Sequence, residues 1–253
     1  MARTIVVSGS ASGLGAATRV KIEKQGDRVI GVDLRDAEVL ADLSTVQGRQ
    51  QAVADATTAC GGRLDGLVGY AGVGPTMKPA SLLATVNFFG QMALLDGLRP
   101  ALARGDHPAA VAVGSVAATV APYDEGCVEA MLAGDEDRAS ELVEAAPDVG
   151  YATSKMAVAR AARRRATMWI AEGVRLNILA PGNSLTPLTQ AALDDPELGP
   201  VMRGVPVPFG RWAENDEIAD VALWLLGPGS RYLVGSFVTV DGGTDAVVRH
   251  DSF

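Results

Sequence analysis

Short apolar runs alternate with longer amphipathic segments along most of the chain. The apolar runs are rich in β-branched residues and end near glycine, serine or aspartate, as buried strands do. The amphipathic segments space their apolar residues three or four positions apart and stop near glycine, as helices do. We expect strands at residues 4–9, 28–34, 64–72, 109–115, 174–182 and 236–243. We expect helices at residues 14–26, 45–62, 81–103, 151–173 and 214–227, the third with Ser81 as its N-cap.

This alternation of strands and helices predicts a parallel sheet covered by helices on both faces. The expected fold class is therefore α/β, a doubly wound parallel sheet in three layers, α/β/α. No repeat, low-complexity tract or linker interrupts the pattern, so residues 1–253 are expected to form a single domain. Residues 183–211 show no clear pattern, and we expect a long irregular loop there.

A helical insert is expected at about residues 117–150, just before the helix that starts near Tyr151. Within it, residues 132–146 predict one helix capped by Asp135. Its apolar face consists of Leu132, Ala139, Leu142, Val143 and Ala146. Its acidic side chains, expected to face water, are Glu136, Asp137, Glu141 and Glu144. This pattern indicates a folded element docked on the protein rather than a disordered loop.

Composition and charge narrow the class of function. A net charge of −8 argues against nucleic-acid binding, which needs a basic face. The apolar runs fall far short of the roughly 20 residues of a membrane span, and we expect no signal peptide. Cys60 and Cys127 match no disulfide framework, and with only His107 and His250 besides we expect no metal site. A cytoplasmic enzyme acting on a small molecule fits these features best.

The segment SGSASGLG joins the first strand to the first helix. Gly9, Gly13 and Gly15 allow a tight turn close to a pyrophosphate, whose charge the free N–H groups of the helix start would bind. A glycine cluster at such a junction can also be a plain turn. Because it follows the first strand directly, we interpret it as the phosphate-binding turn of a Rossmann-type fold.

Asp33 ends the second predicted strand. A carboxylate there accepts hydrogen bonds from an adenosine ribose and repels a 2′-phosphate, so we expect NAD, with NADP less favoured. Arg35 lies close enough to weaken that preference. Asp42 either reaches the adenine or caps the next helix.

Tyr151 and Lys155 stand four residues apart in a predicted helix and so project from one face. An ammonium group beside a phenol lowers the pKa of the tyrosine, which can then exchange a proton with a carbonyl or alkoxide oxygen. Such a pair also arises by chance. Ser115 ends a strand, where ligands bind in open α/β sheets, and its hydroxyl could reach the same oxygen. Asn87 lies inside a predicted helix, an unusual place for an amide.

Taken in order, SGSASGLG, YAG (70–72), Asn87, Ser115, YATSK, APGNSLTP and VDGG resemble the short-chain dehydrogenase/reductase family of the classical type. The resemblance covers nearly the whole chain and implies a catalytic tetrad of Asn87, Ser115, Tyr151 and Lys155. It implies Tyr151 as the acid/base and Lys155 as the group that holds the nicotinamide ribose and lowers the pKa of the tyrosine. It implies that Ser115 orients the carbonyl and that Asn87 supports a water-mediated proton relay. The implied cofactor-binding residues are Gly9, Ser12, Gly13, Leu14, Gly15, Asp33, Leu34, Asp42, Leu43, Ala71, Gly72, Tyr151, Lys155, Pro181, Gly182 and Thr186.

Three departures from the family pattern narrow the likeness. The usual NNAG reads GYAG, so Gly69 and Tyr70 lack the asparagine side chains. The step from Gly72 to Asn87 is short at 15 residues, and the step from Ser115 to Tyr151 is long at 36. With VDLRDAEVLADLST, VNFFG and DGGTDAV, these features resemble the bacterial 3α-hydroxysteroid dehydrogenase/carbonyl reductases, which use NAD(H). In those enzymes such an insert favours a dimer, so we expect a homo-oligomer and a dimer rather than a tetramer.

The expected function is the NAD(H)-dependent interconversion of a secondary alcohol and a ketone, with no membrane or nucleic-acid partner. The alternatives are a 3-ketoacyl-type or other short-chain reductase, with NADP preference, and a non-catalytic dinucleotide-binding sensor. Apolar side chains in 183–211 either close over a bulky ketone or pack that segment down: Leu185, Leu188, Leu193, Met202, Val205, Val207 and Phe209. The arginines of RAARRRA (160–166) are expected to be solvated or salt-bridged, and Trp169 and Ile170 to bury against a partner subunit.

Overall fold

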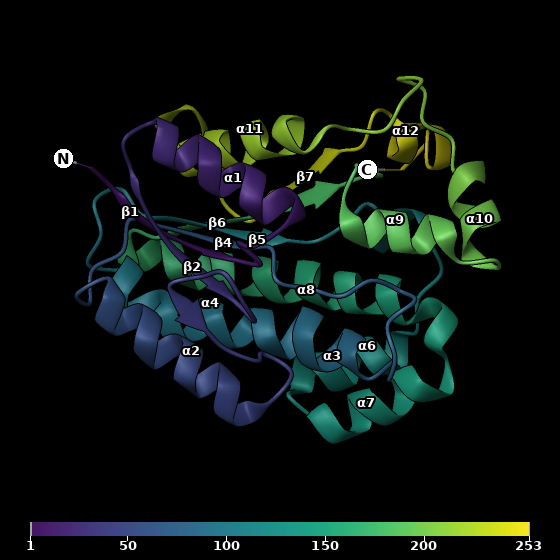
Figure 1. The fold of residues 1–253 in the computed structure, drawn as a ribbon, viewed down its shortest axis with the longest axis horizontal. Coiled ribbons are helices and arrows are strands. Elements are labelled where there is room, and N and C mark those ends of the chain that lie inside the picture. Colours follow the sequence, from purple (N-terminus) through teal and green to yellow (C-terminus); the bar gives the residue numbers. More distant parts are fainter. Residues whose placement is uncertain (1, 253) are drawn as a thin grey trace.

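One sheet of seven parallel strands runs through the molecule, in the order β3-β2-β1-β4-β5-β6-β7 (Figure 1). The computed structural model describes residues 2–252. The strands are β1 (Thr4–Ser8), β2 (Arg28–Asp33), β3 (Val39–Leu40), β4 (Gly66–Gly69), β5 (Ala109–Val113), β6 (Arg175–Pro181) and β7 (Phe237–Val240). The order of connection reverses between β1 and β4, and at such a point open α/β sheets form their ligand crevice. The six predicted strands are present, and only the two-residue β3 lacked a signal.

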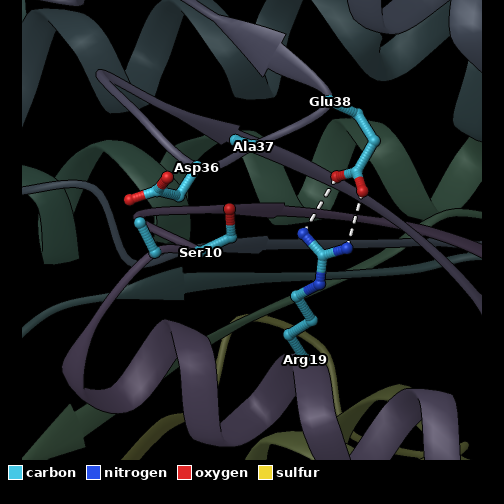
Figure 2. A pocket seen from close by; sticks show the side chains of 6 residues that line it. Ser10, Arg19, Asp36, Ala37 and Glu38 are labelled. Atoms are coloured by element: carbon cyan, nitrogen blue, oxygen red, sulfur yellow. Dashed lines mark hydrogen bonds and ion pairs between the residues drawn. The ribbon is translucent and has the colours of Figure 1, made fainter.

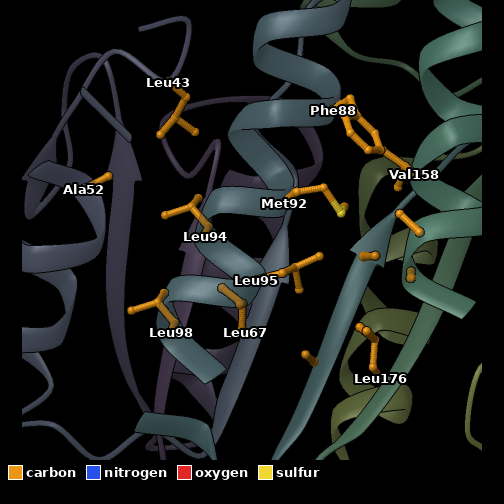
Figure 3. Close-up of a cluster of buried hydrophobic side chains, with 14 of the residues drawn as sticks. Leu43, Ala52, Leu67, Phe88, Met92, Leu94, Leu95, Leu98, Val158 and Leu176 are labelled. Carbon is orange, nitrogen blue, oxygen red and sulfur yellow. The ribbon is translucent and has the colours of Figure 1, made fainter. Parts of the chain in front are cut away.

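Helices cover both faces of this sheet. On one face lie α1 (Gly13–Lys24) and α11 (Asn215–Leu226); on the other lie α2 (Val46–Ala59), α4 (Gln91–Leu102) and α8 (Pro147–Trp169) (Figure 1). Successive strand residues point into different cores, with Val6 in the larger cluster and Ile5 and Val7 in the smaller one. The larger cluster includes Leu95 and Leu98 of α4 and Leu176 of β6, which lie between the sheet and the helices (Figure 3). The predicted three-layer doubly wound fold is confirmed.

The predicted helix 81–103 is built from three pieces. One turn, α3 (Leu82–Ala84), leads into a π-helix, η1 (Thr85–Gly90), and then into α4. Ser81 lies at the N-cap position as predicted, but its hydroxyl makes no capping bond. Its N–H instead donates to the carboxylate of Glu144 at 2.7 Å. The start of this helix is therefore satisfied by the insert rather than by its own side chain.

The insert is helical, as predicted, but it holds three helices before α8 begins. These are α5 (Ala117–Val120), α6 (Glu125–Ala133) and α7 (Glu136–Ala145). Asp135 caps α7 as predicted, accepting a bond from the N–H of Arg138 at 3.0 Å. The prediction of a single helix from Leu132 is wrong, because Gly134 adopts a left-handed conformation (φ 81°) and ends α6.

The insert docks on the protein through both apolar and charged contacts. Ala139 and Val143 of α7 are fully buried in the larger core, as predicted. Glu136 was expected to face water, which is wrong: it accepts two bonds from the guanidinium of Arg49 in α2, at 2.9 and 2.6 Å. Arg49 is itself buried and also donates to the carbonyl of Thr85, the first residue of η1, at 3.2 Å. A single arginine thus joins the insert to the π-helix.

About half of residues 183–211 is helical, so the segment is not the long irregular loop that was expected. It contains α9 (Pro187–Asp194) and α10 (Leu198–Gly204). Thr186 caps α9 by accepting a bond from the N–H of Thr189 at 3.1 Å, and Pro187 occupies the first helical position. Helices of seven or eight residues are too short to show a clear apolar period, so the pattern missed them.

The second half of α8 lies against the chain itself. Its arginines were expected to be solvated or salt-bridged, and this is confirmed: Arg160 pairs with Glu125 and Arg165 pairs with Asp96 at 2.7 Å, while Arg163 and Arg164 are exposed. Trp169 was expected to face a partner subunit, which is wrong, because its side chain is completely buried in the larger core. Ile170, the next residue, remains exposed.

Candidate active site

The glycine-rich turn between β1 and α1 lies against the segment that follows β4. Gly9 has φ of +68°, and a Cβ there would come within 2.8 Å of the N atom of Ala71. A Cβ on Gly15 would come within 2.0 Å of the carbonyl oxygen of Gly9. Only glycine fits these positions, and the backbone N–H groups at the start of α1 are thereby held at the crevice.

The GYAG segment replaces the missing asparagine contacts with other bonds. The carbonyl of Gly69 accepts a bond from Gln91 at 3.0 Å, and the hydroxyl of Tyr70 accepts one from Thr18 at 2.9 Å. The N–H of Ala71 donates to the hydroxyl of Ser8 at 3.1 Å. Gln91 is almost completely buried and was not predicted, although it lies four residues after Asn87, on the same side of the helix.

Asp33 ends β2, as predicted, and holds the glycine-rich turn. One carboxylate oxygen accepts a bond from the N–H of Ala11 at 2.9 Å and the other accepts one from the N–H of Leu34 at 2.7 Å. Asp42 bonds the N–H of Ser44 at 2.9 Å, whereas Thr45 caps α2, so Asp42 is not the helix cap. These bonds leave Asp33 half-buried at the rim of the crevice.

The remaining cofactor candidates differ in what they can present to a ligand. Leu34 is exposed, whereas Leu43 is buried in the larger core and leaves main-chain atoms only. Ser12 precedes α1 without capping it, and Leu14 packs against the smaller core. Gly72 follows Ala71 and is exposed at the crevice.

Tyr151, Lys155 and Ser115 meet at the carboxyl end of β5. Ser115 lies two residues beyond that strand, with its hydroxyl 3.2 Å from the N–H of Ala117, which donates to it. Lys155 is buried in α8, with its Nζ 5.7 Å from the centre of the Tyr151 ring. That Nζ donates to the carbonyl of Val113 at 3.2 Å.

Burial controls the pKa values of this pair. It raises the pKa of Tyr151 above its ordinary value, and the hydroxyl of Ser115 beside it acts in the opposite direction. Burial also lowers the pKa of Lys155 to about 8. We predicted that the lysine would lower the pKa of the tyrosine. For the protein by itself this direction is wrong, because the loss of solvation on burial raises the pKa of Tyr151.

Asn87 lies in η1 and ties two parts of the site together. Its side-chain oxygen accepts a bond from the N–H of Val73 at 2.7 Å, and its amide nitrogen donates to the carbonyl of Val73 at 3.1 Å. The same nitrogen donates to Ser154, beside Lys155 in α8, at 3.3 Å. π-helical turns often mark functional sites, and here one places an amide inside a helix without solvent. The segment after β4 is thus fixed relative to α8.

The end of β6 completes the crevice. Pro181 ends that strand, and a Cβ on Gly182 would come within 2.7 Å of the Cα of Asp241, so this turn also needs glycine. Thr186 faces the glycine-rich turn from across the crevice, where a Cβ on Gly13 would lie 3.4 Å from its Cγ2. Segments from β1, β6 and α9 therefore converge on one side of the site.

The donors of this crevice fit a dinucleotide. Lys155 has three N–H donors and one protein acceptor, the carbonyl of Val113, so donors remain for ribose hydroxyls. The buried hydroxyl of Ser10, in the glycine-rich turn, has no protein partner. Within residues 2–252, no three His, Cys, Asp or Glu side chains gather as a metal site. No helix among those residues is long and apolar enough to cross a membrane.

Comparisons with known proteins agree with this geometry. The family described as Enoyl-(Acyl carrier protein) reductase matches residues 138–245. The chain is 45% identical to the 3-alpha-hydroxysteroid dehydrogenase/carbonyl reductase of Comamonas testosteroni, over 98% of this chain and 99% of that protein. It is 31% identical to the cis-4-hydroxycyclohexanecarboxylate dehydrogenase of Sinomonas cyclohexanicum, over 97% of each.

A solved structure matches as well. The crystal structure of the 3-alpha-hydroxysteroid dehydrogenase from Pseudomonas sp. B-0831 complexed with NADH has a TM-score of 0.95 and 49% identity, and the match covers 99% of this chain and 100% of that one. The chain belongs to the short-chain dehydrogenase/reductase family of oxidoreductases. Within that family it is similar to 3α-hydroxysteroid dehydrogenase/carbonyl reductases, as the sequence motifs indicated.

Proposed function

We propose that this protein is an NAD(H)-dependent oxidoreductase that interconverts a secondary alcohol and a ketone on an apolar ring compound, as a 3α-hydroxysteroid dehydrogenase/carbonyl reductase does. The observation that carries the proposal is the meeting of Ser115, Tyr151 and Lys155 at the carboxyl end of β5, at the same edge of the parallel sheet as the glycine-rich turn after β1. A sensor without chemistry would have no need of a buried tyrosine and lysine side by side.

Each side chain of this group has a distinct task in the proposal. Tyr151 donates its hydroxyl proton to the carbonyl oxygen as that oxygen gains charge, and takes the proton back in the reverse direction. The hydroxyl of Ser115 donates a second bond to the same oxygen and orients it. Lys155 stabilises the phenolate by its charge and offers its free donors to ribose hydroxyls. The bound nicotinamide dinucleotide supplies or accepts the hydride.

In the proposal, Asn87 is a positioning residue. Its side-chain amide is used within the protein, on Val73 and Ser154. A contribution to a proton relay would therefore have to come from its main-chain atoms. The side chain keeps the crevice wall and α8 in a fixed relation.

The charge at the end of β2 supports NAD(H). Asp33 is held with both oxygens at the rim of the crevice, where a 2′-phosphate would meet a carboxylate. The similar Pseudomonas protein was crystallised with NADH.

An apolar wall supports a bulky, apolar ketone. Leu185, just before α9, and Leu188, within α9, keep much of their side chains exposed. A Cβ on Gly74 would come within 2.9 Å of the Cγ of Leu188, so α9 lies over the segment that Asn87 fixes. Steroids and alicyclic ketones present matching apolar surface.

Turnover with a matched set of ketones and both cofactors tests this function. We expect NADH-dependent reduction of 3-ketosteroids and cyclic ketones, with kcat/KM for NADH above that for NADPH. Turnover confined to NADPH and 3-ketoacyl thioesters would favour the acyl reductase instead. Binding of NADH without turnover of any ketone or alcohol in the set would favour a sensor.

A further inference from the structure

A cavity of about 530 Å³ lies beside Asp33 and has no part in the chemistry described above. It is lined by Ser10, Ala11, Arg19, Asp36, Ala37 and Glu38 (Figure 2). Ala11 donates its N–H to Asp33, so the cavity adjoins the carboxylate expected to meet the adenosine ribose. Arg19 is the one basic side chain of this lining.

Glu38 forms an ion pair with the guanidinium of Arg19. Its two oxygens accept bonds from the two terminal nitrogens of Arg19, at 3.0 and 2.6 Å, and one of them also accepts from the N–H of Gly31 at 2.7 Å. Burial works against a charged Glu38, but the bonds from Arg19 and Gly31 outweigh it and hold the pKa of this carboxyl below its ordinary value. The carboxylate is therefore ionised at neutral pH, and it cancels the charge of Arg19.

Ser10 lines the same cavity (Figure 2), and its hydroxyl lies against Gly31. Ser10 is 3% exposed and its hydroxyl has no protein partner, an arrangement that costs free energy unless a ligand or water bonds it. Gly31 makes room for the cluster: a Cβ there would lie 2.4 Å from the Ser10 oxygen and 2.9 Å from that of Glu38. The cavity thus holds a guanidinium, a group that binds phosphate oxygens, and this guanidinium is already paired with Glu38.

We propose that the Arg19–Glu38 ion pair, together with Asp33, sets the choice between NAD(H) and NADP(H). Glu38 occupies the guanidinium that would otherwise bind a 2′-phosphate, and it adds a second negative charge against that phosphate. This inference rests on the proposed dinucleotide function and deepens it. It assigns the preference to a pair of residues that lie outside the end of β2.

Glu38→Gln is the direct test, because the amide oxygen still accepts the N–H of Gly31 while the charge is removed. The probes are adenosine 2′,5′-bisphosphate and 5′-AMP, with dissociation constants measured by titration calorimetry. The ratio of the two constants should shift toward the bisphosphate by about tenfold in Glu38→Gln, as expected for one charge removed near a partly solvated anion. The same shift is expected in the kcat/KM ratio for NADPH over NADH.

Two further variants identify the cause of that shift. Glu23→Gln removes another carboxylate that bonds Arg19, at 2.9 Å, but lies outside the cavity lining, and should leave the ratio within about twofold of wild type. Adding Arg19→Met to Glu38→Gln should abolish the gain. An unchanged ratio in a folded Glu38→Gln that binds both probes would overturn the inference while leaving the proposed function intact. A wild-type protein that binds neither 5′-AMP nor NADH would overturn both.

Discussion

Lys155 keeps its ammonium group inside the protein, with the carbonyl of Val113 as its protein partner. The loss of solvation lowers its pKa from an ordinary 10.5 to about 8. The native protein thus holds this proton less tightly than the unfolded chain does. At neutral pH that difference destabilises the fold by about 3 kcal/mol, and a dinucleotide that bonds the ammonium group would relieve part of the cost.

This shift gives stability a definite pH dependence. Between pH 8 and 10.5 the unfolded chain binds a proton at this lysine that the native protein has released, so the free energy of unfolding should rise with pH. Lys155→Met removes this contribution. We expect the variant to be more stable than wild type at pH 7, with a difference that shrinks toward pH 10. Urea unfolding of both proteins across this pH range, without added dinucleotide, measures the difference. If the free energy of unfolding depended on pH in the same way for both, the lowered pKa of a buried Lys155 would be contradicted.

At single positions, the sequence predicted best where the chemistry requires a particular residue type. Tyr151, Lys155 and Ser115 were predicted in this way; they lie together, and their catalytic roles stay a prediction. The direction of the pKa shift of Tyr151 was predicted wrongly, because it depends on how completely the fold removes solvent from the hydroxyl. Gln91 and the Arg19–Glu38 pair were also missed, since their partners come from distant segments or from main-chain atoms.

At the scale of helices and strands, Arg49 connects three elements. From α2 it bonds Glu136 at the start of α7 and the carbonyl of Thr85 at the start of the π-helix η1. The insert therefore supports the segment that carries Asn87. The contact between Glu136 of the insert and Arg49, and not the apolar face of the insert alone, holds η1 in place relative to α2.

Replacing Arg49 with methionine should loosen this connection. It leaves the carboxylate of Glu136, which is mostly buried, without its partner, and we expect a loss of about 1–3 kcal/mol of unfolding free energy. Amides of η1 and α7 should exchange with deuterium faster, while those of α11 on the other face should not change. Arg138→Met is the matched control, because the ion pair of Arg138 is with the exposed Glu141 and its loss should cost less than about 0.5 kcal/mol. Equal exchange in both variants would argue against the connection.

The order of the elements could be predicted from sequence because each strand and each long helix repeats its own period. The π-helix could not be predicted, since TVNFFG has the pattern of an ordinary helix. The bonds of Asn87 within it go to Val73 and Ser154, which are distant in sequence. The break between α6 and α7 depends on the left-handed Gly134, and a glycine alone does not distinguish a stop from a tolerated interruption.

At the scale of the whole molecule, the sheet carries a separate buried core on each face, and the insert extends the larger one. Cys127, Val128 and Met131 of α6 are fully buried in that core, so the insert is part of the folded body. The single-domain prediction is consistent with one continuous sheet and stays a prediction.

We propose that the protein is a homodimer, because helices of the insert cover the start of α8 and leave less of that helix for a partner. Light scattering of the full chain should give twice the chain mass at micromolar concentration. A mass of one chain or of four would contradict the proposal.

The central claim is that Tyr151 moves the proton in an NAD(H)-dependent reaction, and Tyr151→Phe tests it most directly. The change removes one hydroxyl and keeps the ring packed beside Lys155. We predict that kcat for NADH-dependent ketone reduction falls about a thousandfold, while the dissociation constant for NADH, followed by fluorescence, stays within about threefold of wild type. Turnover at the wild-type rate in this variant would contradict the account.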